Sequence, residues 1–287
     1  MKKIIFIGII VLISFAVYAR LDAPVVENGD EQEEIIDERE SDEMIGEDET
    51  EIEDEEDIEK SDPEKEVKGE IAIIIDDLGY YPELNSELLK LEESLTLAIL
   101  PSLENTEKAV NDFKGRDNFE LILHMPMEPI DEIHREDFML FIDHSKEEMK
   151  DLFSDALIQM NGQAVGVNNH KGSKFTSNSE KTREFLELVR DENLFFVDSY
   201  TIGTSVGYDL AKELSISTAK RDVFLDYVDE KEGIRDRLRE LEELALERGW
   251  AIAIGHHKEN TIRVLQEELP KMRERGIKFV KVSELLN

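Results

Sequence analysis

Aspartate and histidine side chains stand where the apolar runs of this sequence end. The residues at these ends with useful chemistry include Asp76, Asp77, His124, His170 and His256. Histidine nitrogens and carboxylate oxygens are ligands that Zn²⁺ takes from proteins. Two or three histidines with one aspartate could therefore hold Zn²⁺ or a similar divalent ion and leave one position open for water.

The two adjacent carboxylates are the centre of this pattern. The run Ile71–Ile75 has no polar alternation, which predicts a strand buried on both faces, as in a parallel sheet. Such strands carry their chemistry at the carboxyl end. Successive strand side chains point to opposite sides, so we expect Asp76 and Asp77 to do different jobs. A turn with an aspartate cap for the next helix is an alternative explanation.

Further polar residues close or bracket two other predicted strands. Asp198 follows an apolar run, and Arg221 and Asp222 precede a weaker one. Each has a structural alternative, since Asp198 could accept bonds from loop amides and Arg221 could pair with Asp222. His124 and His170 could likewise be a buried histidine and a helix cap. The coincidence of so many aspartates and histidines at strand ends supports a site more than any single residue does.

Strands and amphipathic helical stretches alternate throughout the second part of the chain. The expected strands are Ile71–Asp77, Leu95–Pro101, Phe119–Pro129, Ala164–His170, Leu194–Ser199, Val223–Leu225, Trp250–His256 and Ile277–Val282. About eight strands, each followed by a helix, predict an α/β barrel or a doubly wound sheet, and the count and length favour the barrel. The strand ends of a barrel converge on one mouth, which would bring the polar residues together.

The first part of the chain has a different composition. Lys2 and Lys3 precede an apolar run that ends at Ala19, so residues 1–19 are predicted to be a signal peptide or N-terminal anchor in contact with membrane or translocon. Residues 20–68 are rich in Asp and Glu, which predicts a disordered acidic linker. Residues 69–287 form the predicted domain, exported to the periplasm, the cell exterior or the outer side of a membrane.

The net charge and the absence of cysteine limit the binding partners and the metal ligands that this chain can have. The formal net charge of −35 argues against nucleic acid or anionic lipid as a partner. The 287-residue chain contains no Cys, which excludes disulfides and thiolate metal sites. Any metal must be held by His, Asp, Glu or Asn.

Six motifs in order resemble those of a known family. They are Ile-Asp-Asp-Leu-Gly, His-Met-Pro-Met-Glu-Pro, Gly-Val-Asn-Asn-His-Lys-Gly-Ser, Phe-Phe-Val-Asp-Ser, Lys-Arg-Asp-Val-Phe-Leu-Asp and Ala-Ile-Gly-His. Together they look like the divergent polysaccharide deacetylases, exported bacterial proteins related to the NodB-type carbohydrate esterases. The resemblance covers about residues 68–287 and implies a deformed (β/α) barrel that removes acetyl groups from an N-acetylated sugar with the help of a metal.

The resemblance also implies roles for individual residues. The first aspartate of the pair, Asp76, would be the base, the second, Asp77, would bind metal, and His256 would be the acid. NodB-type enzymes take two metal histidines from one His-x-x-x-His motif, whereas Lys174 stands four residues after His170 here. The second histidine ligand must come from elsewhere, and His124 is the best candidate.

The leading hypothesis is therefore metal-assisted amide hydrolysis of an N-acetylated glycan. The divalent ion, expected to be Zn²⁺, would be held by Asp77, His124 and His170. Asp198, Asp222 or Arg221 would orient or tune the catalytic groups. A non-catalytic envelope protein that binds glycan or a partner through the same mouth is the rival. A phosphoesterase is a weaker alternative, because it would usually want more than one metal and a denser cluster.

Overall fold

The computed structural model describes residues 66–131 and 137–286. The predicted segment 1–19 and nearly all of the predicted linker 20–68 lie outside these ranges. Among the described residues, no helix is both long and apolar enough to cross a membrane.

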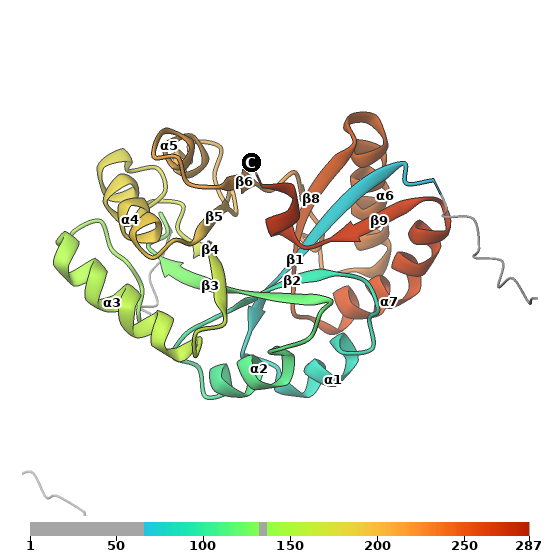
Figure 1. Ribbon diagram of the computed structural model, residues 1–287, viewed down its shortest axis with the longest axis horizontal. Helices are drawn as coiled ribbons and strands as arrows, with labels where there is room; N and C mark the ends of the chain where they lie inside the picture. Colours follow the sequence, from blue (N-terminus) through green and yellow to red (C-terminus); the bar gives the residue numbers. More distant parts are fainter. Residues whose placement is uncertain (1–65, 132–136, 287) are drawn as a thin grey trace, which may run out of the picture. The chain divides into compact units, whose positions relative to one another are not determined.

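Nine strands and seven α-helices alternate along the described chain (Figure 1). The strands are β1 (Gly69–Leu78), β2 (Leu95–Ile99), β3 (Phe119–Met127), β4 (Ala164–Lys171), β5 (Phe195–Asp198), β6 (Thr218–Lys220), β7 (Val223–Phe224), β8 (Trp250–His256) and β9 (Ile277–Val280). The α-helices are α1 (Asn85–Leu88), α2 (Thr106–Phe113), α3 (Lys146–Gln159), α4 (Ser179–Asp191), α5 (Gly207–Glu213), α6 (Lys231–Arg248) and α7 (Glu259–Glu274). Two 3₁₀-helices, Pro82–Leu84 and Val282–Leu285, complete the set.

All strand pairs are parallel. Eight strands follow the order β6-β5-β4-β3-β2-β1-β8-β7, and β9 also pairs with β1. The strands at the two ends of this order, β6 and β7, are separated in sequence only by Arg221 and Asp222. This short segment joins the two ends of the sheet. The backbone N–H of Arg221 donates to the carbonyl of Asp198 in β5, and that of Asp222 donates to the carbonyl of Ile252 in β8. The helices lie around the outside of the strands (Figure 1). The prediction of a deformed (β/α) barrel is confirmed.

Strand periodicity separates the inside of the barrel from the layer beneath the helices. In β1, Ile71, Ile73 and Ile75 belong to the large apolar cluster that packs against the helices. Ala72 and Ile74 belong to the smaller inner cluster. The inner cluster continues through Ile122 of β3 and Ile252 and Ile254 of β8, and Leu285 and Leu286 near the C-terminus pack against it. Burying both faces explains why the strands lack polar alternation until their carboxyl ends.

Candidate metal centre and active site

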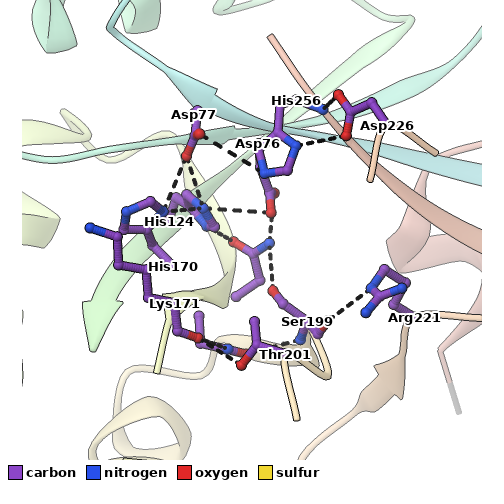
Figure 2. Close-up of polar contacts among 12 residues, drawn as sticks. Asp76, Asp77, His124, His170, Lys171, Ser199, Thr201, Arg221, Asp226 and His256 are labelled. Carbon is purple, nitrogen blue, oxygen red and sulfur yellow. Dashed lines mark hydrogen bonds and ion pairs between the residues drawn. The ribbon is translucent and has the colours of Figure 1, made fainter. Parts of the chain in front are cut away.

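The inward-facing rows of three strands end in polar residues at one mouth of the barrel. Asp76 follows Ala72 and Ile74 on the inner face of β1, and His124 follows Ile122 on β3. His256 follows Ile252 and Ile254 on β8, where it is the register partner of Asp76. Because side chains alternate with a period of two, each polar residue continues the inward row of its strand. Together with His170 from β4 they surround one site (Figure 2).

Asp77 departs from the strand alternation that the sequence predicted. Its φ is 65°, in the left-handed region, and the pairing of β1 with β2 shifts register between Ile75 and Leu78. A bulge of this kind redirects a side chain at a strand end. As a result, both carboxylates lie near the same ring: Asp76 Oδ2 is 3.5 Å from His124 Nε2, and Asp77 Oδ1 is 3.4 Å from it. The expectation that the two side chains diverge was wrong.

The side chains of Asp77, His124 and His170 form a group that could hold one metal ion (Figure 2). Asp77 Oδ1 lies 3.1 Å from His170 Nδ1 and 3.4 Å from His124 Nε2, and the two ring nitrogens are 3.2 Å apart. Tetrahedral ligands at about 2.0–2.2 Å from Zn²⁺ would be separated by about 3.3–3.6 Å. The spacing and the donor types therefore fit a divalent ion such as Zn²⁺.

Asn168 determines which nitrogen of His124 faces this group. Its amide nitrogen donates to Asp76 Oδ1 at 2.8 Å, so its oxygen lies 2.7 Å from His124 Nδ1. A carboxylate accepts only, and an amide oxygen accepts only, so Nδ1 must carry the proton when Asp76 is ionised. Neutral His124 then presents a lone pair at Nε2 to Asp77 and His170. Asp77 Oδ1 and His124 Nε2 are then two electron-rich atoms 3.4 Å apart, an arrangement that favours a cation between them.

His256 and Asp226 form a hydrogen-bonded pair at the other side of Asp77. His256 Nδ1 lies 2.8 Å from Asp226 Oδ1, and His256 Nε2 lies 4.0 Å from Asp77 Oδ2. The second oxygen of Asp226 accepts the backbone N–H of His256 at 2.8 Å and the hydroxyl of Thr261 at 2.7 Å. These three bonds fix the carboxylate, which in turn fixes the orientation of the imidazole ring.

Burial and charge act in opposite directions on the two carboxylates of β1. Burial raises the pKa of Asp76 and outweighs the lowering effect of His124 and His256. Burial also acts to raise the pKa of Asp77, but hydrogen bonds and charge from His124 and His170 bring that pKa well below its usual range. Asp76 is thus the easier of the two to protonate, and Asp77 stays ionised.

The imidazole of His256 is shifted toward its charged form. Burial acts to lower its pKa, but the hydrogen bond and charge of Asp226 outweigh burial, so the pKa of His256 rises. The same pair lowers the pKa of Asp226, although burial acts to raise it. The dyad therefore holds a proton on His256 beside an ionised Asp226.

Asp198 and Asp222, predicted to be catalytic, are not part of this group. Asp198 accepts the backbone N–H of Tyr200 on one oxygen, and the Ser205 hydroxyl and the Tyr208 N–H on the other. It holds the loop before α5, which is the alternative that the sequence left open. Asp222 is bound by Arg248 and by the N–H of Ile252 at 2.8 Å. Structural partners occupy both carboxylates, so these contacts do not support a catalytic role for Asp198 or Asp222.

Arg221 lies beside the site, but it does not pair with Asp222. Its Nε donates to the carbonyl of Ser199 at 2.9 Å and one Nη donates to that of Tyr200 at 3.0 Å (Figure 2). It lines a cavity of about 520 Å³ together with the candidate base, acid and histidine ligands. The other lining residues of that cavity are Asn169, Lys171, Ser199, Thr201, Phe224, Tyr227 and Ile254.

The remaining histidines and Lys174 lie elsewhere. His257, left out of the predicted site, is fully buried and does not line the cavity, and burial lowers its pKa to about 4. His144 accepts the N–H of Phe141. His134 lies outside the described residues. Lys174 Nζ donates to Glu128 Oε1 at 2.7 Å. The residue four positions after His170 therefore contacts Glu128 and not the ligand group.

Asn168 and Asp226 stand in the quoted motifs, but neither was assigned a role from the sequence. Asn168 is the first polar residue of β4 that follows the inward row, and a neutral amide gives little signal among carboxylates and histidines. Asp226 comes two residues after β7 and meets His256 only through the pairing of β7 with β8. Both residues continue the inward-facing row of side chains of their strand, and this alignment could have identified them.

Comparison with known proteins gives three kinds of match. A family model described as divergent polysaccharide deacetylase matches residues 73–286. "Uncharacterized protein YibQ" of Escherichia coli (strain K12) is 33% identical over 219 residues, covering 76% of this chain and 68% of that protein. An "Uncharacterized protein" of Haemophilus influenzae (strain ATCC 51907 / DSM 11121 / KW20 / Rd) is 32% identical over 209 residues, covering 72% and 73%.

A solved structure shows the same fold. It is the crystal structure of uncharacterized protein ATU2773 from Agrobacterium tumefaciens C58, with a TM-score of 0.71 and 22% sequence identity. The similarity covers 76% of this chain and 89% of that one. The barrel is therefore a known arrangement in solved proteins.

Proposed function

This chain belongs to the divergent polysaccharide deacetylases, and we propose that it is a metal-dependent hydrolase that removes acetyl groups from an N-acetylated glycan of the cell envelope. One observation carries the proposal. Candidates for base and acid both border the three-residue ligand group, since Asp76 Oδ2 lies 3.5 Å from His124 Nε2 and His256 Nε2 lies 4.0 Å from Asp77 Oδ2. Hydrolysis of an amide needs both groups within reach of one reacting centre.

Asp77, His124 and His170 would hold the ion, which the donor set favours as Zn²⁺. When bound, a divalent ion would polarise the acetyl carbonyl and lower the pKa of water. His124 is held in the tautomer that presents Nε2 by its contact with Asn168. The pKa of the Asp77 carboxyl lies well below its usual range, because its contacts with the two histidines outweigh burial, so Asp77 offers the ion an anionic oxygen.

Asp76 would be the general base. Asn168 holds its Oδ1, which leaves Oδ2 directed toward the ligand group. Burial raises the pKa of Asp76 and makes the carboxylate a better proton acceptor than an exposed aspartate. Asp76 would take the proton of the attacking water as the new carbon–oxygen bond forms.

His256 would be the general acid. The effect of Asp226 on its pKa keeps the ring protonated, and the bond from Nδ1 to Asp226 leaves Nε2 directed at the site. His256 would donate its Nε2 proton to the sugar nitrogen as the carbon–nitrogen bond breaks. The products are acetate and the free amine of the sugar.

Export completes the proposal. Lys2, Lys3 and the apolar run that ends at Ala19 support delivery of the domain to the envelope, where N-acetylated glycans occur. The acidic residues of 20–68 would separate the domain from the membrane if the first segment stays uncleaved.

Acetate release from N-acetylated envelope glycans, measured together with metal content, tests the proposal. We expect acetate from the Zn²⁺-loaded protein, loss of release after chelation and recovery when Zn²⁺ is returned. The variant Asp77→Ala should lose both the metal and the activity. The matched control is Asp191→Ala, which removes an exposed carboxylate at the end of α4 and should change neither.

Two results would contradict the proposal. Zn²⁺-loaded protein that binds the glycans without releasing acetate would identify a binding protein on a deacetylase-like barrel. Asp77→Ala protein that keeps its full metal content would show that the ion is held elsewhere.

A further inference from the structure

The two candidate histidine ligands come from different strands, so contacts between segments set their spacing. His124 lies in β3 and is paired with Asn168 of β4. His170 lies further along β4, opposite Pro126. Their ring nitrogens are nevertheless 3.2 Å apart (Figure 2). Ligands on two strands keep such a distance only if the segments that follow the strands are also held together.

The chain turns sharply directly after His170. Lys171 and Gly172 both have φ in the left-handed region, at 55° and 84°. A Cβ at Gly172 would lie 2.9 Å from the Cβ of Met127, so a glycine allows this turn to approach the end of β3 so closely. The register pairing of β3 with β4 ends at Met127 and Lys171. The position of His170 therefore depends on what holds the turn against the end of β3.

Glu128, the first residue after β3, holds the segment that contains this turn. Its carbonyl accepts the backbone N–H groups of Lys174 at 3.1 Å and Phe175 at 3.0 Å. Its carboxylate accepts Lys174 Nζ on Oε1 at 2.7 Å and the backbone N–H of Ile142 on Oε2 at 3.0 Å. Its own N–H donates to the carbonyl of Leu140 at 2.9 Å. One residue thus connects the end of β3 to the segment after β4 and to the segment before α3.

Glu128 is the buried member of its ion pair with Lys174. The Glu128 side chain is 6% exposed, and that of Lys174 is 42% exposed. A buried carboxylate loses hydration, so apolar residues of similar volume often stabilise a fold as well as a buried ion pair does. A charged hydrogen bond is directional, however, and fixes the distance between the two groups that it joins. The pair is therefore better suited to positioning the two segments than to stabilising the fold.

We propose that the Glu128–Lys174 pair positions His170 for the metal ion, so that histidines on two separate strands act as one pair of ligands. Glu128 is a positioning residue, since it neither belongs to the ligand group nor lines the cavity beside it. It acts through the backbone of residues 170–175. The inference rests on the proposed function only for the presence of a metal ion, and not for the reaction that the ion serves.

Metal binding to the full-length protein, measured without any glycan, tests the inference. Zn²⁺ affinity is determined by competition with a chelating dye. Co²⁺ bound in place of Zn²⁺ reports the geometry of the ligands through its visible absorption bands. A change in ligand geometry is a readout that a residue with a purely structural role would leave unaltered in the folded protein.

Two single variants remove the ion pair from either side. Glu128→Gln places an NH₂ group against one of the two donors that the carboxylate accepted, and Lys174→Met keeps the apolar part of the side chain. Each should weaken Zn²⁺ affinity by about 10–100-fold, the usual effect of a lost supporting contact, and should alter the Co²⁺ spectrum. Asn169 and Thr201 still donate to the carbonyl of Lys171, so we expect His170 to be displaced and not released.

The double variant separates positioning from a folding defect. Lys174→Met alone leaves the buried Glu128 carboxylate without its cation, whereas Glu128→Gln with Lys174→Met leaves no unpaired charge. Because both changes remove the same pair, the double variant should weaken Zn²⁺ affinity about as much as either single variant. A double variant that folds stably and regains the Zn²⁺ affinity of the parent would overturn the inference.

Glu93→Gln is the matched control. The Glu93 side chain is also buried, at 3% exposed, and pairs with Arg273 at 3.2 Å. It precedes β2 and so lies at the opposite end of the strands from the ligand group. Glu93→Gln should lower thermal stability as Glu128→Gln does, but it should leave Zn²⁺ affinity and the Co²⁺ spectrum unchanged.

The outcomes distinguish this inference from the proposed function. Zn²⁺ affinity that stays at the parent value in Glu128→Gln and Lys174→Met, or a loss that Glu93→Gln shares, would overturn the inference. Acetate release by the parent would still support the proposed function in that case. Weaker Zn²⁺ binding and an altered Co²⁺ spectrum in the two variants, in a protein that releases no acetate, would support the inference and contradict the proposed function.

Discussion

The aspartates at the mouth of the barrel differ in the groups that contact their carboxylates. Asp76 and Asp77 lie beside the ring nitrogens of His124 and His170, which are candidate metal ligands. Asp198 meets two backbone N–H groups and a hydroxyl, none of which titrates. Both kinds of aspartate are buried at strand ends, so position alone does not separate a reactive carboxylate from a structural one. The partners do.

The close packing around the structural aspartate supports the same distinction. A Cβ at Gly207, the first residue of α5, would lie 2.8 Å from Asp198 Oδ2. The helix therefore begins against the carboxylate with no room for a ligand between them. Asp76 instead lines a cavity of about 520 Å³. The proposed base needs that space, because the attacking water and the acetyl group must reach it.

The largest expected difference between the two kinds of aspartate is in turnover. Asp76→Asn should lower kcat for acetate release by about 10²–10⁴-fold, the usual effect of a missing general base. The asparagine oxygen can still accept from Asn168, so fold and metal content should be retained. Kinetics on protein of measured Zn²⁺ content would test this. Turnover that survives the substitution would remove Asp76 from the mechanism and leave the comparison without its reactive member.

A smaller loss of activity is expected when the hydrogen bonds of Asn168, which connect Asp76 to His124, are removed. Asn168→Leu removes the donor to Asp76 and the acceptor for His124 Nδ1 while keeping a similar volume. Loss of such a supporting contact typically lowers metal affinity or activity by about 10–100-fold. Zn²⁺ titration and kcat/KM measure the two effects. Asn85→Leu is the control, because Asn85 is also buried but bonds to Asp112 away from the site. Equal Zn²⁺ affinity in the two variants would show that Asn168 is structural only.

The sequence predicted the barrel and much of the site because both depend on strand periodicity. Ile71–Ile75 required a strand buried on both faces, and the ends of such strands meet at one mouth. His124, His170 and His256 were found by the same rule. The left-handed turn at Asp77 was not, since aspartate adopts it only in particular surroundings.

The structural partners of Asp198 and Asp222 could not be predicted from the sequence, for a different physical reason. Asp198 accepts bonds from the backbone N–H groups of Tyr200 and Tyr208 and from the Ser205 hydroxyl. Asp222 is held by Arg248 and by the backbone N–H of Ile252, both distant in sequence. Backbone amides are identical at every non-proline residue, so the sequence carries no sign of which one a carboxylate will meet. Asp226 was missed because its partner His256 is distant in sequence and is brought close only by the pairing of β7 with β8.

The effect of Asp226 on His256 predicts a change in pH dependence. A general acid must be protonated, so kcat/KM falls as pH rises through the pKa of His256. Hydrogen bonding and charge from Asp226 raise that pKa, against the effect of burial. Asp226→Asn should therefore move the basic limb to lower pH, because the ring loses an adjacent opposite charge. A pH profile of kcat/KM measures the shift. A basic limb that stays in place would mean that a group other than His256 titrates there.

The smallest effect on turnover, and the one that tests the comparison most directly, is expected at Asp198. Asp198→Asn places an amide NH₂ where one carboxylate oxygen accepted bonds, so at least one of the donors Tyr200 N, Ser205 Oγ and Tyr208 N loses its partner. An unsatisfied buried group costs about 1–3 kcal/mol. Thermal unfolding should show the loss, with Tm lower by about 2–4 °C for each kcal/mol in a domain of this size.

Ser205→Ala gives a graded comparison for the same carboxylate, because it removes one donor and leaves the two backbone donors in place. Its loss of stability should be smaller than that of Asp198→Asn. Both proteins, when folded and loaded with Zn²⁺, should release acetate within about twofold of the parent, since neither residue touches the ligand group and surface or structural changes of this kind alter stability first. A hundredfold lower kcat for Asp198→Asn with normal metal content would place that carboxylate in the reactive set. The identity of a carboxylate's partners would then no longer separate the two kinds of aspartate.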